Sequence, residues 1–172
     1  GCDVGFAFDG DGDRLGVVDN SGNILSGDQL LLLLARDLLQ RRPGSKIIAD
    51  VKTSDVVFRK IEEWGGVPIM WKTGHSFIKT KMAEENAIMA GEMSGHLFFA
   101  EDYYGFDDAI LAALKVLDIL ARAKQKLSVL LADLPVMVGT PEIRIDCTEE
   151  RKFPIIEELK ALLDQQGVSY LD

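Results

Sequence analysis

Residues 46–71, KIIADVKTSDVVFRKIEEWGGVPIMW, contain two short apolar strands separated by one helix. Residues 46–51 form the first apolar run, and Val67–Trp71 forms the second. Between them, Thr53 or Ser54 can cap a helix that carries apolar side chains on one face and ends at a Gly-Gly pair. Short apolar strands that alternate with helices indicate a parallel sheet covered on both faces.

The same alternation continues along the chain. We expect further helices over residues 28–42 (capped by Asp28), 76–85, 107–124 and 128–132, and strands over 87–90 and 97–100 joined by a hairpin-like turn. The predicted fold class is therefore α/β: a mixed, mainly parallel sheet with helices on both faces, an α/β/α sandwich over residues 27–134. We expect partial flanking domains on either side of it.

The two ends of the chain cannot form cores of their own. Residues 1–26 predict only three strands, Val4–Phe8, Leu15–Asp19 and 24–26, too few to bury a core. Residues 135–172 predict a linker, one strand over 142–146 and one helix over 150–166. We therefore expect the tail of a preceding domain at one end, the incomplete start of a following domain at the other, and a chain that is a fragment of a longer protein.

Composition excludes several classes of partner. The 172 residues carry a net charge of −9 and are 47% hydrophobic, with a pI of about 4.7. An acidic surface of this kind does not attract nucleic acid or an anionic membrane. The apolar run Leu30–Leu34 is too short to span a bilayer. Two cysteines far apart in sequence form no disulfide framework, which favours a reducing cytoplasm.

The segment FDGDGDR, residues 8–14, places Asp9, Asp11 and Asp13 at alternate positions separated by glycines. Glycine lets the backbone turn tightly enough for the three carboxylates to converge, and such a group requires a hard cation such as Mg²⁺. An EF-hand loop would need glycine at its sixth position and glutamate at its twelfth, but Arg14 and Asn20 stand there. Arg14 indicates an anion nearby, such as a phosphate. The alternative is a solvated acidic turn without a ligand.

Three polar loops follow the expected parallel strands, and ligands of open α/β sheets bind at such strand ends. Lys52 follows the first strand, His75 lies in the loop after the second, and residues 92–96 follow the third. Glu92, Ser94 and His96 offer a carboxylate, a hydroxyl and an imidazole, groups that suit neighbouring sugar hydroxyls. The alternatives are an ordinary β-turn at 92–96, a surface lysine and structural histidines.

Three motifs in order resemble those of the α-D-phosphohexomutases, the family of phosphomannomutase and phosphoglucomutase enzymes: DGDGDR at residues 9–14, KTGHSFIK at 72–79 and GEMSGH at 91–96. The resemblance implies transfer of a phosphoryl group between the 1- and 6-hydroxyls of a hexose, through a phosphoserine and a 1,6-bisphosphate such as glucose 1,6-bisphosphate. It further implies Mg²⁺ on Asp9, Asp11 and Asp13.

The resemblance also implies roles for the remaining candidates. Arg14 would steady the phosphate, while Lys52, His75 or His96 would supply proton transfer or orientation; the base stays unassigned among them. Glu92 and Ser94 would contact the 3- and 4-hydroxyls of the sugar. Met93 fits the mannose/glucose branch of the family, since the glucosamine branch usually carries glutamine there.

Two parts of the family pattern are absent from the sequence. The loop that bears the phosphoserine belongs to domain 1, and the loop that grips the non-reacting phosphate belongs to domain 4. We therefore expect hexose phosphates and the missing domains 1, 2 and 4 as partners, and no mutase turnover by the chain alone. A phosphoglucosamine mutase fragment and a non-catalytic sugar-phosphate or metal-binding module stay open as alternatives.

Overall fold

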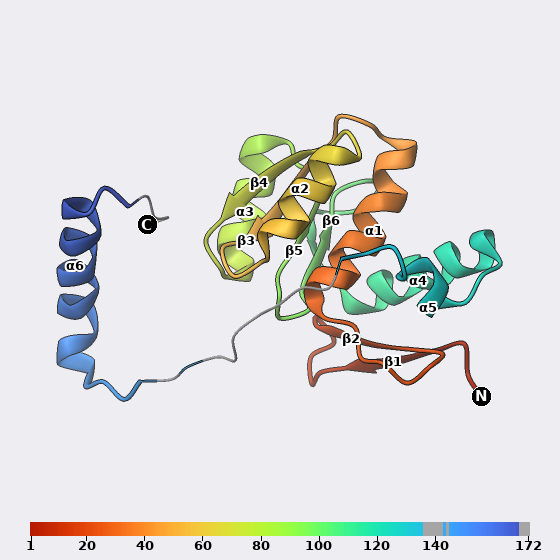
Figure 1. Cartoon of the computed structure of the whole chain (residues 1–172), viewed down its shortest axis with the longest axis horizontal. Coiled ribbons are helices and arrows are strands. Elements are labelled where there is room, and N and C mark those ends of the chain that lie inside the picture. The colour runs from red at the N-terminus through yellow and green to blue at the C-terminus, as the bar shows by residue number, and fades with distance from the viewer. Residues whose placement is uncertain (136–142, 144, 169–172) are drawn as a thin grey trace. The chain divides into compact units, whose positions relative to one another are not determined.

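A computed structural model of the chain describes residues 1–135, 143 and 145–168. The chain divides into two compact units, Gly1–Met137 and Val138–Asp172. The first unit contains a five-stranded sheet with its helices and a separate two-stranded hairpin; the described residues of the second contain one helix (Figure 1).

The five-stranded sheet has the order β4-β3-β5-β6-β7. Its strands are β3 (Lys46–Asp50), β4 (Val67–Trp71), β5 (Met89–Gly91), β6 (Leu97–Phe99) and β7 (Phe106–Asp107). Strand β3 lies parallel to β4 and β5, whereas β6 is antiparallel to β5 and β7 is antiparallel to β6. The predicted mixed α/β sheet is confirmed, with β7 as an additional edge strand that the sequence did not predict.

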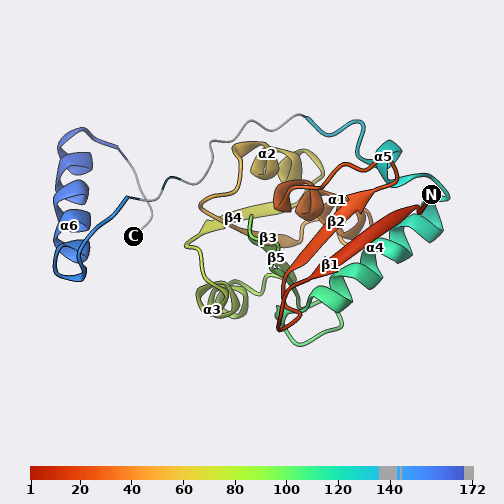
Figure 2. The ribbon, with the colours of Figure 1, turned by 90° about the horizontal axis from the view of Figure 1, so that it is seen from below.

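Helices cover both faces of this sheet. They are α1 (Gly27–Arg41), α2 (Asp55–Glu63), α3 (His75–Glu85), α4 (Ala109–Ala123) and the short α5 (Leu127–Leu130). Alternate residues of β3 point to opposite faces, as in any strand. Ile47 and Ala49 pack in the larger core with α1, α2 and α4, while Ile48 packs with Ile78 and Met82 of α3. Figure 2 shows α3 on one side of the sheet and α1 and α2 on the other.

Helix α1 begins two residues earlier than a cap at Asp28 predicts, because its cap is Ser26. Ser26 Oγ accepts a hydrogen bond from the Gln29 amide at 3.2 Å, and Gln29 Oε1 accepts one from the Ser26 amide at 3.0 Å. This reciprocal capping box satisfies two amides at the helix start. Asp28 is instead buried and accepts a hydrogen bond from the backbone of Ser54, which is itself the cap of α2.

The hairpin consists of β1 (Val4–Phe8) and β2 (Leu15–Asp19), which pair in antiparallel register over their full predicted lengths. Leu15 and Val17 of β2 are buried in the larger core, so the hairpin is anchored to the sheet unit. The predicted strand over 24–26 is wrong. It is reduced to one isolated bridge between Val18 and Ile24, because the chain already enters the cap of α1 at residue 26.

The second unit contains α6 (Glu149–Gln165), close to the predicted helix. Most of its apolar side chains, including Phe153 and Leu159, are exposed. Residues 142 and 144 of the predicted strand lie outside the described residues, and Ile143, Ile145 and Asp146 are not in a strand. Nothing within the described ranges is a helix long and apolar enough to cross a membrane.

Candidate functional site

Asp50 connects the three loops that leave the parallel strands. It is the last residue of β3 and is 0% exposed. Its carboxylate accepts hydrogen bonds from Thr53 Oγ1 at 2.7 Å, Thr73 Oγ1 at 2.9 Å and the amide of Met93 at 3.2 Å. These donors follow β3, β4 and β5 respectively, so the expected meeting of the three loops at one sheet edge is confirmed.

Lys52 lies beside this carboxylate at the same edge. Its Nζ is 4.0 Å from Asp50 Oδ2, and its side chain is about half exposed. The ammonium group therefore lies near the Asp50 carboxylate and is accessible to solvent. Sequence reasoning selected Lys52 and missed Asp50. The signal for Asp50 is a single carboxylate at the end of strand KIIAD, directly after three apolar residues.

The loop after β5 is a tight turn with a buried carboxylate. The Glu92 amide bonds to His96 O at 2.9 Å, and the Gly95 amide bonds to Glu92 O at 3.0 Å. Glu92 is 3% exposed, and its Oε1 accepts a hydrogen bond of 2.6 Å from the amide of Gly74, in the loop after β4. Ser94, by contrast, is exposed. The turn therefore holds a buried acceptor and an exposed hydroxyl.

The carboxylate loop brings Asp9, Asp11 and Asp13 together: each offers an oxygen within 4.8 Å of the others. Such an all-oxygen donor set fits Mg²⁺. Asp9 also accepts hydrogen bonds from the Asp13 amide at 3.2 Å and the Arg14 amide at 3.1 Å, which fix the turn.

Arg14 folds back onto this loop. Its Nε donates to Asp9 Oδ2 at 2.6 Å, and this hydrogen bond is the main reason that the pKa of Asp9 is lowered to about 2. Burial raises the pKa of Asp13. The hydrogen bond from Arg14 thus favours the ionised form of Asp9, and Arg14 would have to leave it to reach a phosphate.

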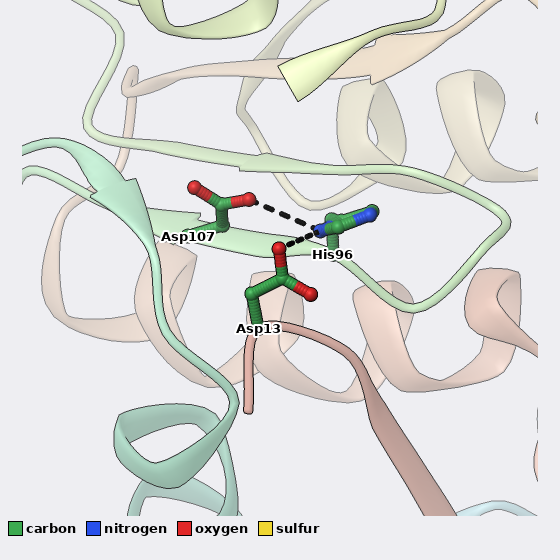
Figure 3. A group of neighbouring side chains, drawn as sticks. All are labelled: Asp13, His96 and Asp107. Atoms are coloured by element: carbon green, nitrogen blue, oxygen red, sulfur yellow. Dashed lines mark ion pairs between the residues drawn. The ribbon is translucent and has the colours of Figure 1, made fainter. Parts of the chain in front are cut away.

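The carboxylate loop and the turn after β5 are in direct contact. The Leu15 amide donates to Gly95 O at 3.1 Å, next to an isolated bridge between Arg14 and His96. His96 Nδ1 lies 3.7 Å from Asp13 Oδ2 (Figure 3). Hence a metal on the carboxylates would lie beside the imidazole.

His96 has two further neighbours. Its Nδ1 lies 3.0 Å from Asp107 Oδ2 in β7, and its ring stacks at 6.3 Å between centroids on the ring of His75. Asp107 was not among the predicted site residues, because nothing local in the sequence indicates the two-residue strand that carries it. The described site thus combines three clustered carboxylates, two imidazoles, an exposed lysine and further polar side chains.

Comparison with known proteins assigns the α/β/α unit to a family. Residues 26–137 match the family model described as phosphoglucomutase/phosphomannomutase, alpha/beta/alpha domain III. The chain belongs to the phosphoglucomutase/phosphomannomutase family.

Named relatives agree with this assignment. The chain is 52% identical over 160 residues to phosphomannomutase/phosphoglucomutase of Pseudomonas putida, covering 93% of the chain and 35% of that protein. It is 47% identical over 169 residues to phosphoglucomutase of Neisseria gonorrhoeae, covering 98% of the chain and 36% of that protein.

A crystal structure of a phosphoglucomutase/phosphomannomutase family protein from Burkholderia thailandensis matches with a TM-score of 0.83 and 48% identity. The match covers 92% of this chain and 33% of that one. The chain therefore spans about a third of the length of the relatives it matches.

Proposed function

We propose that the chain supplies the metal-binding and sugar-binding loops of a mutase that interconverts hexose 1-phosphate and hexose 6-phosphate through a phosphoserine and a 1,6-bisphosphate. The observation that carries this proposal is the contact between the two loops. The Leu15 amide bonds to Gly95 O at 3.1 Å, and Asp13 Oδ2 lies 3.7 Å from His96 Nδ1. Phosphate chemistry and sugar recognition can therefore occur at one point.

In this proposal Asp9, Asp11 and Asp13 hold Mg²⁺, which when bound neutralises charge on the transferring phosphoryl group. Arg14 leaves Asp9 to bind the phosphate, because a guanidinium pairs as well with phosphate oxygens as with a carboxylate. Lys52 binds the same class of anion from its exposed position at the end of β3.

In the same proposal, the sugar hydroxyls bind to the turn after β5. Because Glu92 Oε1 accepts the Gly74 amide, its other oxygen is the acceptor for a hydroxyl, and the exposed Ser94 supplies a second contact. His96 or His75 moves the proton of the reacting hydroxyl. The relatives are named for mannose and glucose substrates, and Met93 agrees with that branch over glucosamine.

We propose further that residues 1–26 complete a preceding domain and residues 135–172 begin a following one. The family match over 26–137 supports a separate middle domain. The phosphoserine and the grip on the second phosphate then come from domains 1 and 4, so the chain alone does not turn over hexose phosphates. A coupled assay of glucose 1-phosphate conversion tests this, and detectable product would refute it.

The metal assignment is tested by calorimetric titration of the chain with Mg²⁺, with and without glucose 1,6-bisphosphate. We expect binding by the parent and by Asp3→Ala, which removes an exposed acid outside the loop. Asp11→Ala should abolish binding, because it removes one of three ligand oxygens. Equal Mg²⁺ affinity of Asp11→Ala and the parent would show that the carboxylate loop is not the site.

A further inference from the structure

His96 and Asp107 form a close polar pair in the candidate site. His96 Nδ1 lies 3.0 Å from Asp107 Oδ2 (Figure 3), a distance typical of a hydrogen bond between a ring N–H and an oxygen. The Asp107 side chain is 7% exposed and that of His96 is 15% exposed. Within the described residues neither atom has another hydrogen-bond partner, and buried polar atoms are almost always satisfied. The imidazole and this carboxylate are therefore each other's partner.

Asp13 is the other carboxylate near this nitrogen, but it is the weaker candidate. Its Oδ2 lies 3.7 Å from His96 Nδ1, beyond hydrogen-bond distance, and its side chain is 32% exposed. Asp13 also belongs to the three-carboxylate group to which we assign Mg²⁺. Because Asp107 lies outside that group, its carboxylate remains available to the imidazole when the metal is bound.

Lys79 orients the Asp107 carboxylate from helix α3. Lys79 Nζ donates a hydrogen bond to Asp107 Oδ1 at 3.3 Å, so the other oxygen, Oδ2, is the one that faces His96. An ammonium group only donates hydrogen bonds, and a carboxylate only accepts them. The hydrogen between Oδ2 and Nδ1 must therefore come from the imidazole.

The two histidines of the chain differ in this respect. Their rings stack with centroids 6.3 Å apart, and the His96 ring also lies 6.4 Å from the ring of Phe98. The His75 imidazole makes no ion pair or side-chain hydrogen bond with any residue that the structure describes. Asp107 thus gives His96 a fixed partner that His75 lacks among those residues.

We propose that Asp107 is a positioning residue for His96: its carboxylate fixes the imidazole with the hydrogen on Nδ1 and leaves Nε2 free to accept a proton. In a neutral imidazole, one ring nitrogen carries the hydrogen and the other is the acceptor. The inference rests on the proposed function, in which His96 or His75 moves the proton of the reacting hydroxyl. It adds Asp107 and Lys79 as the residues that prepare His96 for that step.

The proton balance follows from this arrangement. The hydroxyl O–H bond breaks as its proton passes to Nε2, and the electron pair stays on the hydroxyl oxygen, which attacks the phosphoryl group. His96 then carries a hydrogen on each nitrogen and a positive charge, beside the Asp107 carboxylate at 3.0 Å. This carboxylate stabilises the imidazolium. When the phosphoryl group leaves the sugar oxygen again, Nε2 returns the proton to that oxygen.

Nitrogen NMR of the isotope-labelled chain tests the inference, because the two tautomers of a neutral imidazole give different ring nitrogen shifts. The spectrum is recorded at about pH 8.5, roughly two units above the ordinary histidine pKa of about 6.5. The chain has two histidines, so His75→Gln identifies the His96 signals. In the parent we expect Nδ1–H to exceed Nε2–H at least about tenfold, since a hydrogen bond to a charged group contributes more free energy than that ratio requires.

Asp107→Asn should reverse this preference. The Lys79 ammonium group needs an acceptor, so the carboxamide oxygen takes the place of Oδ1 and the NH₂ group faces His96. An NH₂ group donates to Nδ1, and the ring hydrogen must then move to Nε2. Asp118→Asn, which changes an exposed acid of α4 paired with Arg122, is the control and should keep the parent tautomer. Backbone amide spectra establish that each variant is folded.

Two results would overturn the inference. One is a parent spectrum in which His96 carries its hydrogen on Nε2, and this result requires no substitution. The other is an unchanged tautomer in folded Asp107→Asn; an altered tautomer in Asp13→Asn would then make Asp13 the partner of the imidazole. The measurement uses no Mg²⁺, substrate or turnover. Failure of this inference is therefore distinguishable from failure of the proposed function, which the Mg²⁺ titration of Asp11→Ala tests.

Discussion

Replacement of Asp50 by alanine should destabilise the three loops that follow the parallel strands β3, β4 and β5. Its buried carboxylate accepts hydrogen bonds from Thr53, Thr73 and the amide of Met93, which belong to three different loops. Asp50→Ala removes both acceptor oxygens, and with them all three hydrogen bonds, at once. The threonine hydroxyls can rotate toward other acceptors or water, but the Met93 amide is fixed by the tight turn that follows it.

The expected destabilisation follows from these contacts. A hydrogen bond to a charged group contributes about 1.5–3 kcal/mol, and a stranded buried donor costs about 1–3 kcal/mol. Removing a fully buried charge also relieves its desolvation, which offsets part of the loss. We therefore expect Asp50→Ala to lower the free energy of unfolding by about 2–4 kcal/mol. Asp50→Asn keeps one acceptor oxygen and should lose about 1 kcal/mol.

Urea unfolding measures the loss in the free energy of global unfolding. Amide hydrogen exchange at Met93 and Gly74 measures the local loss of protection in the loops. With about 1.4 kcal/mol per tenfold change, exchange at Met93 should speed up at least tenfold in Asp50→Ala. Asp3→Ala, an exposed acid, serves as the control and should match the parent. A loss below about 0.5 kcal/mol, or unchanged exchange at Met93, would refute the role of Asp50.

Two further predictions concern stability. Gly27→Ala should destabilise the fold by at least about 1 kcal/mol and disturb the turn after β5, because a Cβ there would lie 2.4 Å from the backbone oxygen of Met93. Gly10→Ala, whose Cβ meets nothing within 4 Å, is the matched control, and equal urea midpoints for the two variants would contradict the close contact. The pKa of Glu85 is lowered from 4.5 to about 2, mainly by the hydrogen bond from Lys46. Its contribution to stability is therefore present above pH 4.5 and lost as the pH falls toward about 2. Lys46→Met should make the free energy of unfolding, measured in urea across this pH range, depend less on pH. An unchanged pH dependence would show that the ion pair does not contribute to stability.

Local patterns in the sequence predicted most of the fold. Val4–Phe8, Leu15–Asp19 and Val67–Trp71 are strands with the predicted bounds, because each apolar run is bounded by polar or glycine residues that end a strand. The loops after the parallel strands were also located correctly, since strand direction alone puts them at one edge.

What the sequence could not predict depends on distant partners. Asp28 has the residue type of a helix cap, but Ser26 takes that position because Gln29 completes the capping box. Strand β7 has two residues and exists through its antiparallel pairing with β6. A motif search cannot find Asp107 for the same reason, because only the pairing of β7 with β6 brings Asp107 next to His96.

The position of the carboxylate loop depends on one backbone conformation more than 80 residues further along the chain. Gly95 has φ = +98°, and a Cβ on it would lie 3.0 Å from the backbone oxygen of Leu15. Only glycine therefore allows Gly95 O to accept the Leu15 amide at 3.1 Å. That hydrogen bond fixes the end of the carboxylate loop against the turn that carries Glu92. The turn after β5 and the end of the carboxylate loop at Leu15 are therefore held together by the backbone itself.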